Sequence, residues 1–332
     1  MRVCLRLLAL MVLITPSLVY AAEPDKPVRL VWYPRFSPDS KSLATAHGDW
    51  DAKNGGEVRL WDAATGKPKY VLRQARGIRS VSFSPKSTLL AAGGYGRYVA
   101  IYDTQTGKQI RQWTTPATAE VVQYHPDGKL VVVAHGDGAV RLWEVETGKQ
   151  MAAISGIHKG EIWGMMVSPD GKLAATAGQD GMVCITQIES GKRPHRFPTP
   201  GSNSVAFTSN GKQLAAGAGD SAIRIYDVEN GTELQKLDGH EGGSITDLQF
   251  GPKDKVLVSA GFDKTIRVWD LSDPAAGKLK ETLRGHAHFV FGAALSADGK
   301  LIASGGWDDR VKVWNAQTFK EVWSWDRSKA SE

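Results

Sequence analysis

A pattern that recurs about every forty residues constrains this 332-residue chain more than any other feature of its sequence. The clearest copy, residues 239–270, begins with Gly-His, continues through two apolar alternating segments and ends with Trp-Asp. One residue, usually aromatic, ends the third apolar segment of each copy, and successive positions lie 40 to 45 residues apart. These positions are Trp61, Tyr102, Trp143, Thr186, Tyr226, Trp269 and Trp314. Seven copies at one spacing predict a repeat architecture in which each copy is one structural unit.

Each copy contains four short segments in which apolar and polar residues alternate, as they do in β-strands. In the second copy these segments are residues 78–83, 89–92, 99–102 and 109–113. Sequences such as Ser-Pro-Asp-Gly and Thr-Gly-Lys separate the segments and are typical of tight hairpin turns. The Gly-Lys pairs do not belong to a phosphate-binding loop, because no Gly-x-x-x-x-Gly-Lys-Ser/Thr motif precedes a helix. The sequence therefore predicts an all-β chain of four-stranded antiparallel units.

Residues 1–21 lie outside the repeats and have the composition of a secretory signal peptide. Arg2 and Arg6 precede an apolar run at residues 7–14, and small or aliphatic residues lead to Ala21. The run is shorter than the roughly 20 apolar residues that span a bilayer. We therefore expect cleavage after Ala21 and a secreted or periplasmic protein, with an uncleaved membrane anchor as the alternative.

The expected domain organisation follows from these two features. The signal peptide at residues 1–21 precedes a short linker at 22–27, the repeats occupy 28–326, and residues 327–332 form a tail. No other stretch is apolar enough to span a bilayer, so no membrane span is expected after cleavage.

Composition excludes several classes of site. Cleavage leaves Cys184 as the sole cysteine, so the mature chain has neither an internal disulfide nor a cysteine-rich zinc or haem site. The net charge is +6, or +4 without Arg2 and Arg6, and no run of basic residues suggests nucleic acid as a partner. Single histidines such as His47 and His135 carry no predicted role, and no cluster has metal-ligand spacing. No metal or cofactor is expected, and Asp49-Trp50-Asp51 is interpreted as a solvated loop in preference to a cation site.

Four-stranded units at this spacing, with Gly-His at the start and Trp-Asp at the end, resemble WD40 repeats. The resemblance covers about residues 28–326 and is strongest in the sixth and seventh copies, which begin at Gly239-His240 and Gly285-His286. It implies a seven-bladed β-propeller around a central channel. The segment at residues 321–325 is expected to complete blade 7 from its own repeat, with a contribution from residues 24–30 as the alternative way of closing the ring.

The resemblance also gives a structural interpretation to Ser, His and Asp residues that would otherwise suggest catalysis. It implies tetrads in which a turn Asp accepts a hydrogen bond from a His, the His contacts a hydroxyl, and the hydroxyl contacts a Trp indole. The members are His240, Ser259, Asp263 and Trp269 in blade 6, His286, Ser304, Asp308 and Trp314 in blade 7, and His158, Thr176 and Asp180, without the Trp, in blade 4. A nucleophile would need one cleft with oxyanion donors, whereas this grouping recurs from blade to blade. We therefore predict no catalytic residue and no enzymatic activity.

Function is then expected at exposed positions that differ between repeats. In WD40 propellers, partners often bind the face that carries the loops between strands two and three and between blades. Candidate residues at these positions gather in blades 6, 7 and 1 and extend to blades 2 and 4. They are Trp32, Trp50, Arg79, Tyr95, Glu161, Trp163, Phe262, Phe289, Phe291 and Trp307. Aromatic and Arg side chains are typical of interaction hot spots; packing between blades is the alternative for Trp32 and Phe291, whereas Phe262 and Trp307 are expected to be exposed.

The sequence thus predicts a non-catalytic scaffold that binds a protein or peptide outside the cytoplasm through this aromatic face. An accessory subunit of a larger envelope complex is a variant of the same hypothesis. The alternative is a small-ligand-binding or enzymatic propeller that uses the channel mouth. Only Glu120 and Glu161 are candidate acids for such a site.

Overall fold

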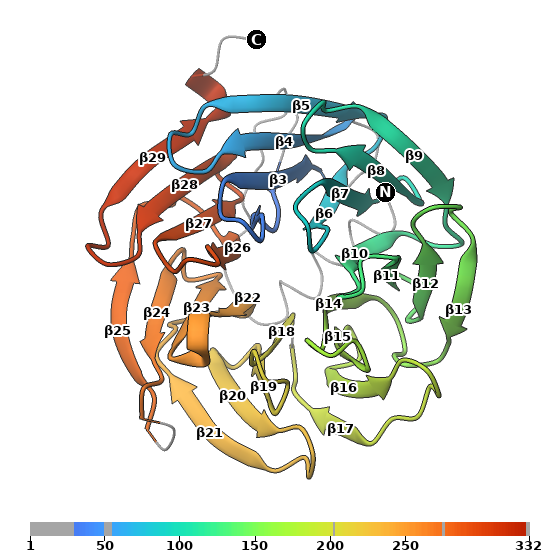
Figure 1. The fold of residues 1–332 in the computed structure, drawn as a ribbon. Coiled ribbons are helices and arrows are strands. Elements are labelled where there is room, and N and C mark those ends of the chain that lie inside the picture. Colours follow the sequence, from blue (N-terminus) through green and yellow to red (C-terminus); the bar gives the residue numbers. More distant parts are fainter. Residues whose placement is uncertain (1–29, 50–54, 202, 274–275, 330–332) are drawn as a thin grey trace.

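Seven antiparallel β-sheets are arranged in a ring around a central axis (Figure 1). The structure, a computed structural model, describes residues 30–49, 55–201, 203–273 and 276–329. Six sheets have four strands, and the first has an additional short strand because two short strands, β1 and β2, share its inner edge. The predicted all-β class and the seven four-stranded blades are confirmed.

The strands follow one another from the centre of each blade to its outer edge. Blade 1 contains β1 (Leu30–Val31), β2 (Arg35–Phe36), β3 (Ser42–Gly48), β4 (Gly56–Asp62) and β5 (Pro68–Gln74); blade 2 contains β6 (Ile78–Phe83), β7 (Leu89–Gly94), β8 (Tyr98–Asp103) and β9 (Gln109–Thr114); blade 3 contains β10 (Ala119–Tyr124), β11 (Leu130–His135), β12 (Val140–Glu144) and β13 (Gln150–Ile154). Blade 4 contains β14 (Ile162–Val167), β15 (Leu173–Gly178), β16 (Met182–Gln187) and β17 (His195–Pro198), and blade 5 contains β18 (Ser204–Phe207), β19 (Gln213–Gly217), β20 (Ala222–Asp227) and β21 (Glu233–Asp238). Blade 6 contains β22 (Ile245–Phe250), β23 (Val256–Gly261), β24 (Ile266–Asp270) and β25 (Lys278–Leu283), and blade 7 contains β26 (Val290–Leu295), β27 (Leu301–Gly306), β28 (Arg310–Asn315) and β29 (Glu321–Asp326). Two 3-10 turns, η1 (Pro252–Asp254) and η2 (Arg327–Lys329), accompany them. In the described part of the chain, no helix is long and apolar enough to cross a bilayer.

The hydrophobic core is divided into seven clusters, each built mainly from two neighbouring blades. Between blades 7 and 1, for example, Leu43 and Trp61 pack against Val311 and Val313. Every blade therefore has apolar side chains on both of its faces. Because a single blade cannot cover these faces by itself, the core is complete only when the ring closes.

A β-bulge interrupts the pairing of the first two strands in five of the blades. A bulge leaves one residue without a partner in the ladder and changes the direction of its side chain. The five bulged residues are Arg79, Glu120, Trp163, Thr246 and Phe291. All five are buried. The innermost strands therefore direct these side chains into the protein. Three of the predicted binding residues, Arg79, Trp163 and Phe291, are among them.

The ring closes by side-chain packing between blades 7 and 1. The outermost strand of blade 7, β29, pairs with β28 of the same repeat, as expected from the sequence. Across the seam, the Trp323 indole donates a hydrogen bond to the Ala63 carbonyl at 3.0 Å, and the Trp61 ring lies 5.9 Å from Trp323 and 5.5 Å from Trp325. Residues 24–29, which offered an alternative closure, lie outside the described residues. We call Trp61, Trp323 and Trp325 the tryptophan seam.

The turn η2 adds polar contacts to this seam. Arg327 forms ion pairs with Glu57 of blade 1 and, at 3.1 Å, with Asp309 of blade 7. The Arg59 guanidinium lies 4.3 Å from the ring centre of Trp325, a favourable cation–π arrangement. Burial opposes ionisation of the Glu57 carboxyl, but the hydrogen bond from Arg59 and the nearby positive charges outweigh it and lower its pKa to about 2. Glu57 therefore remains charged and bound to both arginines at neutral pH.

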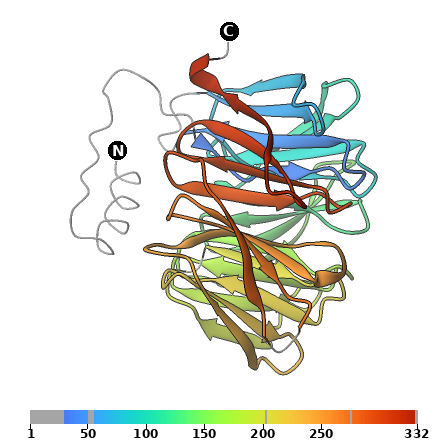
Figure 2. The same cartoon turned by 90° about the vertical axis from the view of Figure 1, so that its left-hand side faces the viewer.

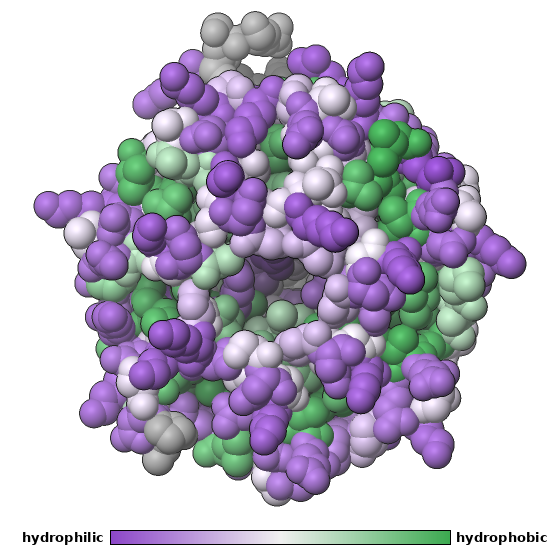
Figure 3. All heavy atoms as spheres, viewed as in Figure 1, coloured by the Kyte–Doolittle hydropathy of each residue, from purple (hydrophilic) through white to green (hydrophobic). Residues whose placement is uncertain are grey.

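Seen from the side, the ring is a flattened disc, and η2 extends from the edge of blade 7 (Figure 2). On the face drawn in Figure 3, hydrophilic side chains surround a central hollow. The loops that carry the predicted binding residues connect the second and third strands and the successive blades, so they lie together at one face of the disc.

Candidate protein-docking face

Four half-buried rings gather where blades 6 and 7 meet. Phe262 follows β23, Phe289 precedes β26 and Trp307 follows β27. The Phe262 and Phe289 rings stack at 4.5 Å, and Trp307 lies 5.9 Å from Phe289. His288 completes the group, 4.9 Å from the Trp307 ring. We call these four residues the aromatic cluster.

Backbone hydrogen bonds fix the loops that carry the cluster. The Trp307 amide donates to the Phe289 carbonyl at 2.8 Å, and the Phe262 amide donates to the Ser244 carbonyl at 3.1 Å. Each bond ties the turn after a second strand to the loop that enters the first strand of the same blade. Because both loops are held in this way, the rings are presented in a fixed arrangement, which reduces the entropy cost of binding.

His288 is the member of the cluster that the sequence analysis did not assign. The sequence places it in a loop two residues after His286, with no spacing that suggests a ligand. In the structure its ring lies between Phe289, at 4.5 Å, and Trp307. Burial and then the nearby charge of Lys264 lower the pKa of His288, so it contributes a neutral ring at neutral pH. Its position beside two predicted aromatic residues was the signal that could have revealed it.

Two predicted binding residues, Trp32 and Phe291, form the floor beneath the cluster. Trp32 is 1% exposed and Phe291 is 3% exposed, and their ring centres lie 4.7 Å apart. Phe291 also stacks on Trp307 at 6.0 Å, and the Trp32 indole donates to the Gly48 carbonyl at 3.2 Å. These two residues follow the alternative given for them, packing between blades: the bulge in β26 turns Phe291 inward, and Trp32 covers it from blade 1.

Arg79 is also buried and does not belong to an exposed rim. Its guanidinium forms an ion pair with Glu120 of the next blade and lies 5.3 Å from the Trp32 ring centre. Both charged residues occupy bulges and are almost fully buried, with 6% and 2% exposure. This pair also weakens the case for a ligand site at the channel mouth, because the Glu120 carboxylate is already neutralised by a neighbouring blade.

The remaining predicted binding residues are spread over other blades. Trp163 is buried in the bulge of β14, and its indole donates to the half-buried Glu161 carboxylate at 3.2 Å. Tyr95 is half-buried and packs against the core cluster of blades 1 and 2. Trp50 lies outside the described residues. The structure thus brings the members from blades 6, 7 and 1 together, with Arg79 and Tyr95 of blade 2 beside their floor, and of this group Phe262, Phe289 and Trp307 form the half-buried aromatic cluster.

The predicted tetrads of blades 6 and 7 are continuous hydrogen-bonded chains. In blade 6, His240 Nδ1 lies 2.9 Å from the Asp263 carboxylate, and its Nε2 lies 2.7 Å from Ser259 Oγ, to which the Trp269 indole donates at 2.9 Å. Because Nδ1–H donates to the carboxylate, Nε2 accepts from the serine hydroxyl. Asp263 also accepts from the amide of Glu241.

Blade 7 repeats this arrangement, and blade 4 contains part of it. The corresponding distances in blade 7 are 2.9 Å for His286 to Asp308, 2.8 Å for His286 to Ser304 and 3.2 Å for Trp314 to Ser304. In blade 4, His158 lies 2.8 Å from both Asp180 and Thr176. All of these groups run through the interior of a blade between its strands. The side chains of His240, Asp263, His286 and Asp308 are almost completely buried.

Blade 1 contains a further network that the sequence analysis missed. The Trp61 indole donates to Thr45 Oγ1 at 2.9 Å, and the same hydroxyl lies 2.8 Å from His47 Nε2. Here the histidine comes from the second strand and not from the loop before the blade. His47, to which no role was assigned, is completely buried. The Thr-x-His spacing within one strand was the available signal, since it places both side chains on one face.

The electrostatics of the tetrads agree with a structural role. Burial by itself would raise the pKa of Asp263, but its hydrogen bonds with His240, Thr265 and the Glu241 amide outweigh burial and hold the pKa well below its usual range. Asp308 is shifted in the same direction by His286. Both carboxylates are therefore ionised and fully engaged at neutral pH. Among the described residues, no three His, Cys, Asp or Glu side chains are grouped so that they could hold a metal ion.

Comparison with known families agrees with this architecture. The family model described as WD domain, G-beta repeat matches four segments, at residues 149–186, 191–227, 231–270 and 277–315. They extend from the fourth strand of blade 3, β13, to the third strand of blade 7, β28. The chain is a WD40-repeat β-propeller. A second model, described as Outer membrane protein assembly factor BamB, matches residues 50–152 in the first three blades of the propeller.

The similar proteins either carry WD repeats by name or match this chain in sequence along most of its length. The guanine nucleotide-binding protein subunit beta of Schizosaccharomyces pombe is 28% identical over 291 residues, which cover 85% of this chain and 90% of that protein. Its counterpart in Arabidopsis thaliana is 24% identical over 304 residues, 84% of this chain and 78% of the relative. WD repeat and SOCS box-containing protein 1 of Homo sapiens is 39% identical over 107 residues, but the match covers only 32% of this chain and 25% of the human protein. These similarities indicate a scaffold for protein interactions.

We expect Asp263→Ala to reduce the free energy of unfolding of the WD40 propeller by roughly 2–4 kcal/mol. The substitution leaves the buried His240 Nδ1–H and the Glu241 amide without their acceptor. Asp137→Ala is a matched control, because Asp137 occupies the same turn position in blade 3 but pairs with Arg141 at the surface. That control is expected to cost less than about 1 kcal/mol. Urea unfolding of both variants tests the assignment. Equal losses of unfolding free energy would show that the tetrad of Asp263 stabilises the fold no more than the surface ion pair of Asp137 does.

Proposed function

We propose that this WD40 propeller is a non-catalytic scaffold that docks a protein or peptide partner on the aromatic cluster. The proposal rests on the different burial of two layers of aromatic rings where blades 6, 7 and 1 meet. Trp32 and Phe291 are buried and form a rigid floor, whereas Phe262, Phe289 and Trp307 above them are half-buried. Rings that are held rigidly from below and partly open above have the character of a binding hot spot.

The relatives support a binding role in place of a catalytic one. Two of them are named as the beta subunit of a guanine nucleotide-binding protein, so they act as parts of larger assemblies. The Ser, His and Asp residues that suggested chemistry hydrogen-bond within their own blades. The channel-mouth alternative receives less support, because Glu120 is paired with Arg79 and Glu161 accepts from Trp163.

The double variant Phe262→Ala/Trp307→Ala tests the proposed face. Affinity capture from the native source, quantified by mass spectrometry, should recover a specific partner with the wild-type protein and at least tenfold less of it with the double variant. Ile110→Ala/Met151→Ala is the matched control, since it removes two side chains that are 51% and 53% exposed on the outer strands of blades 2 and 3. Equal capture by the double variant and the wild type, with unchanged melting temperatures, would reject the proposed face.

We further propose that the protein works outside the cytoplasm, in the cell envelope or beyond it. The basic and apolar character of residues 1–21 supports this location, as does the match of residues 50–152 to a family model for an outer-membrane assembly factor. N-terminal sequencing of the protein from its native source is expected to begin at Ala22. A mature chain that retains Met1, recovered from the cytoplasmic fraction, would contradict the proposed location.

A further inference from the structure

Positively charged side chains border the aromatic cluster on blades 6 and 7. Lys264 lies two residues after Phe262 in the same turn and is exposed. Its positive charge lowers the pKa of His288, in addition to the larger effect of burial. Arg284 is exposed in the loop that enters blade 7, and Lys329 is exposed at the end of η2. Within the described part of the chain, none of these three cations forms an ion pair.

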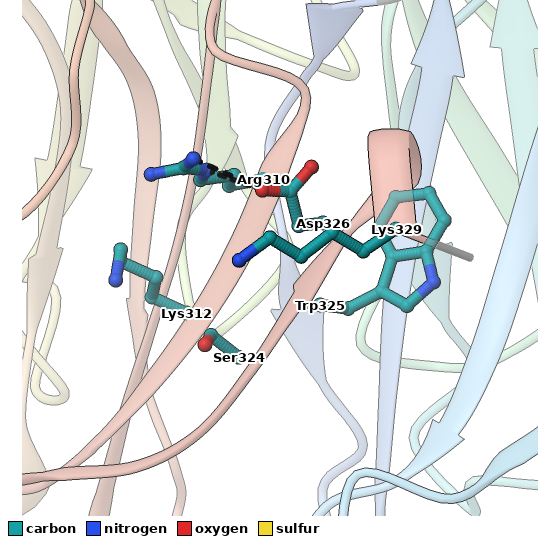
Figure 4. A pocket seen from close by; sticks show the side chains of 6 residues that line it. All are labelled: Arg310, Lys312, Ser324, Trp325, Asp326 and Lys329. Carbon is teal, nitrogen blue, oxygen red and sulfur yellow. Dashed lines mark hydrogen bonds and ion pairs between the residues drawn. The ribbon is translucent and has the colours of Figure 1, made fainter.

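A pocket of about 440 Å³ lies on the same blade, between β28, β29 and η2 (Figure 4). It is lined by Arg310, Lys312, Ser324, Trp325, Asp326 and Lys329. In Figure 4 the side-chain nitrogens of Arg310, Lys312 and Lys329 lie on one side of the pocket, and the Trp325 indole lies on the other. Three cationic groups and one hydroxyl therefore face a space large enough for a carboxylate side chain.

The acidic groups near this pocket do not cancel its charge. Asp326 pairs with Arg310 at 3.0 Å, and Glu321 pairs with Lys312 at 2.6 Å. Lys329 remains in addition to these two pairs. Asp309, at the base of the same turn, is bound to Arg327, and Asp308 is held by His286. The pocket lining together with Glu321 therefore has three cationic and two anionic side chains, and Lys329 is the cation that neither ion pair neutralises.

One short turn connects the aromatic cluster with the pocket. Trp307 is the first residue of the turn that follows β27, and Arg310, which lines the pocket, begins β28 three residues later. On the other side, a Cβ atom at Gly285 would lie 3.6 Å from Lys312 Nζ, so the loop that carries Arg284 also passes beside the pocket. A ligand that covers Trp307 and continues along blade 7 therefore reaches the cations directly.

We propose that the partner is a protein segment in which an apolar or aromatic side chain is followed or preceded by acidic residues. The apolar side chain packs on Phe262 and Phe289, and the carboxylates approach Lys264 and the pocket at Arg310 and Lys329. This inference rests on the proposed function and specifies the chemistry of the partner. Exposed charges at the border of an interface mainly accelerate association and determine specificity, so binding is expected to weaken as salt is added.

The test is a selection of displayed random peptides on the full-length protein. We expect the enriched peptides to combine an aromatic or aliphatic residue with at least two Asp or Glu residues and to contain few Lys or Arg residues. The synthetic form of the most enriched peptide should bind Lys264→Glu/Lys329→Glu at least tenfold more weakly than wild type. Lys129→Glu/Lys172→Glu, a matched reversal of two exposed lysines in turns between first and second strands, should change its affinity less than twofold.

The outcomes distinguish this inference from the function on which it rests. The proposal of an acidic partner is wrong if the enriched peptides are neutral or basic, or if they bind Lys264→Glu/Lys329→Glu as tightly as wild type. If those peptides still lose binding to Phe262→Ala/Trp307→Ala, the aromatic docking face stands. Peptides that bind this aromatic variant as tightly as wild type contradict the docking face itself, and failure to enrich any peptide counts against the inference. Competition by a DNA oligonucleotide at equal or lower concentration would identify the site as a general polyanion site and would also overturn the proposal.

Discussion

The packing of blade 7 against blade 1 is the interaction on which the rest of this propeller depends. Each blade is apolar on both faces, so no blade buries its core side chains until it has a neighbour on each side. No strand is exchanged between the first and last repeats in the described structure: β29 pairs within its own repeat. The tryptophan seam and Arg327 therefore replace backbone pairing with indole packing, one indole-to-carbonyl hydrogen bond and the ion pair of Arg327 with Glu57.

The candidate docking face is built across the same junction between blades 7 and 1. Trp32 belongs to blade 1, but its ring lies against Phe291 of blade 7, and Phe291 supports Trp307. Phe262 of blade 6 contacts this floor at 6.2 Å. The half-buried rings therefore keep their arrangement only while the ring is closed. Closure and the docking face therefore both depend on the packing of blade 7 against blade 1, through two separate sets of aromatic contacts: the tryptophan seam and the pair Trp32–Phe291.

Much of the fold could be predicted from the sequence because it depends on local patterns that repeat. The spacing of the terminal aromatic residues determined the number of blades, and period-two alternation located the strands. The tetrad residues of blades 6 and 7 could also be named, because the resemblance to WD40 repeats supplied their roles and each recurs at a matching position. The proximity of Phe262 and Phe289 could be predicted for the same reason, because both positions occur in neighbouring loops of adjacent blades.

The burial of Arg79, Trp163 and Phe291 could not be predicted in this way. Alternation assigns side chains to faces only while the strand pairs regularly, and one inserted residue reverses the assignment. Each of these residues occupies such a bulge. His47 was missed for a related reason: its contact with Thr45 and Trp61 uses a strand position at which the repeats of blades 4, 6 and 7 have no histidine.

Hydrogen–deuterium exchange of Trp323→Ala tests most directly whether closure and the docking face are one structure. Backbone amides of β5 and β29 are expected to lose protection, and the segments around Phe289–Phe291 and Trp307 are expected to lose protection with them, while blades 3 and 4 remain protected. Loss of protection confined to β5 and β29, with the segments of the aromatic cluster unchanged, would contradict the claim that the seam supports the docking face.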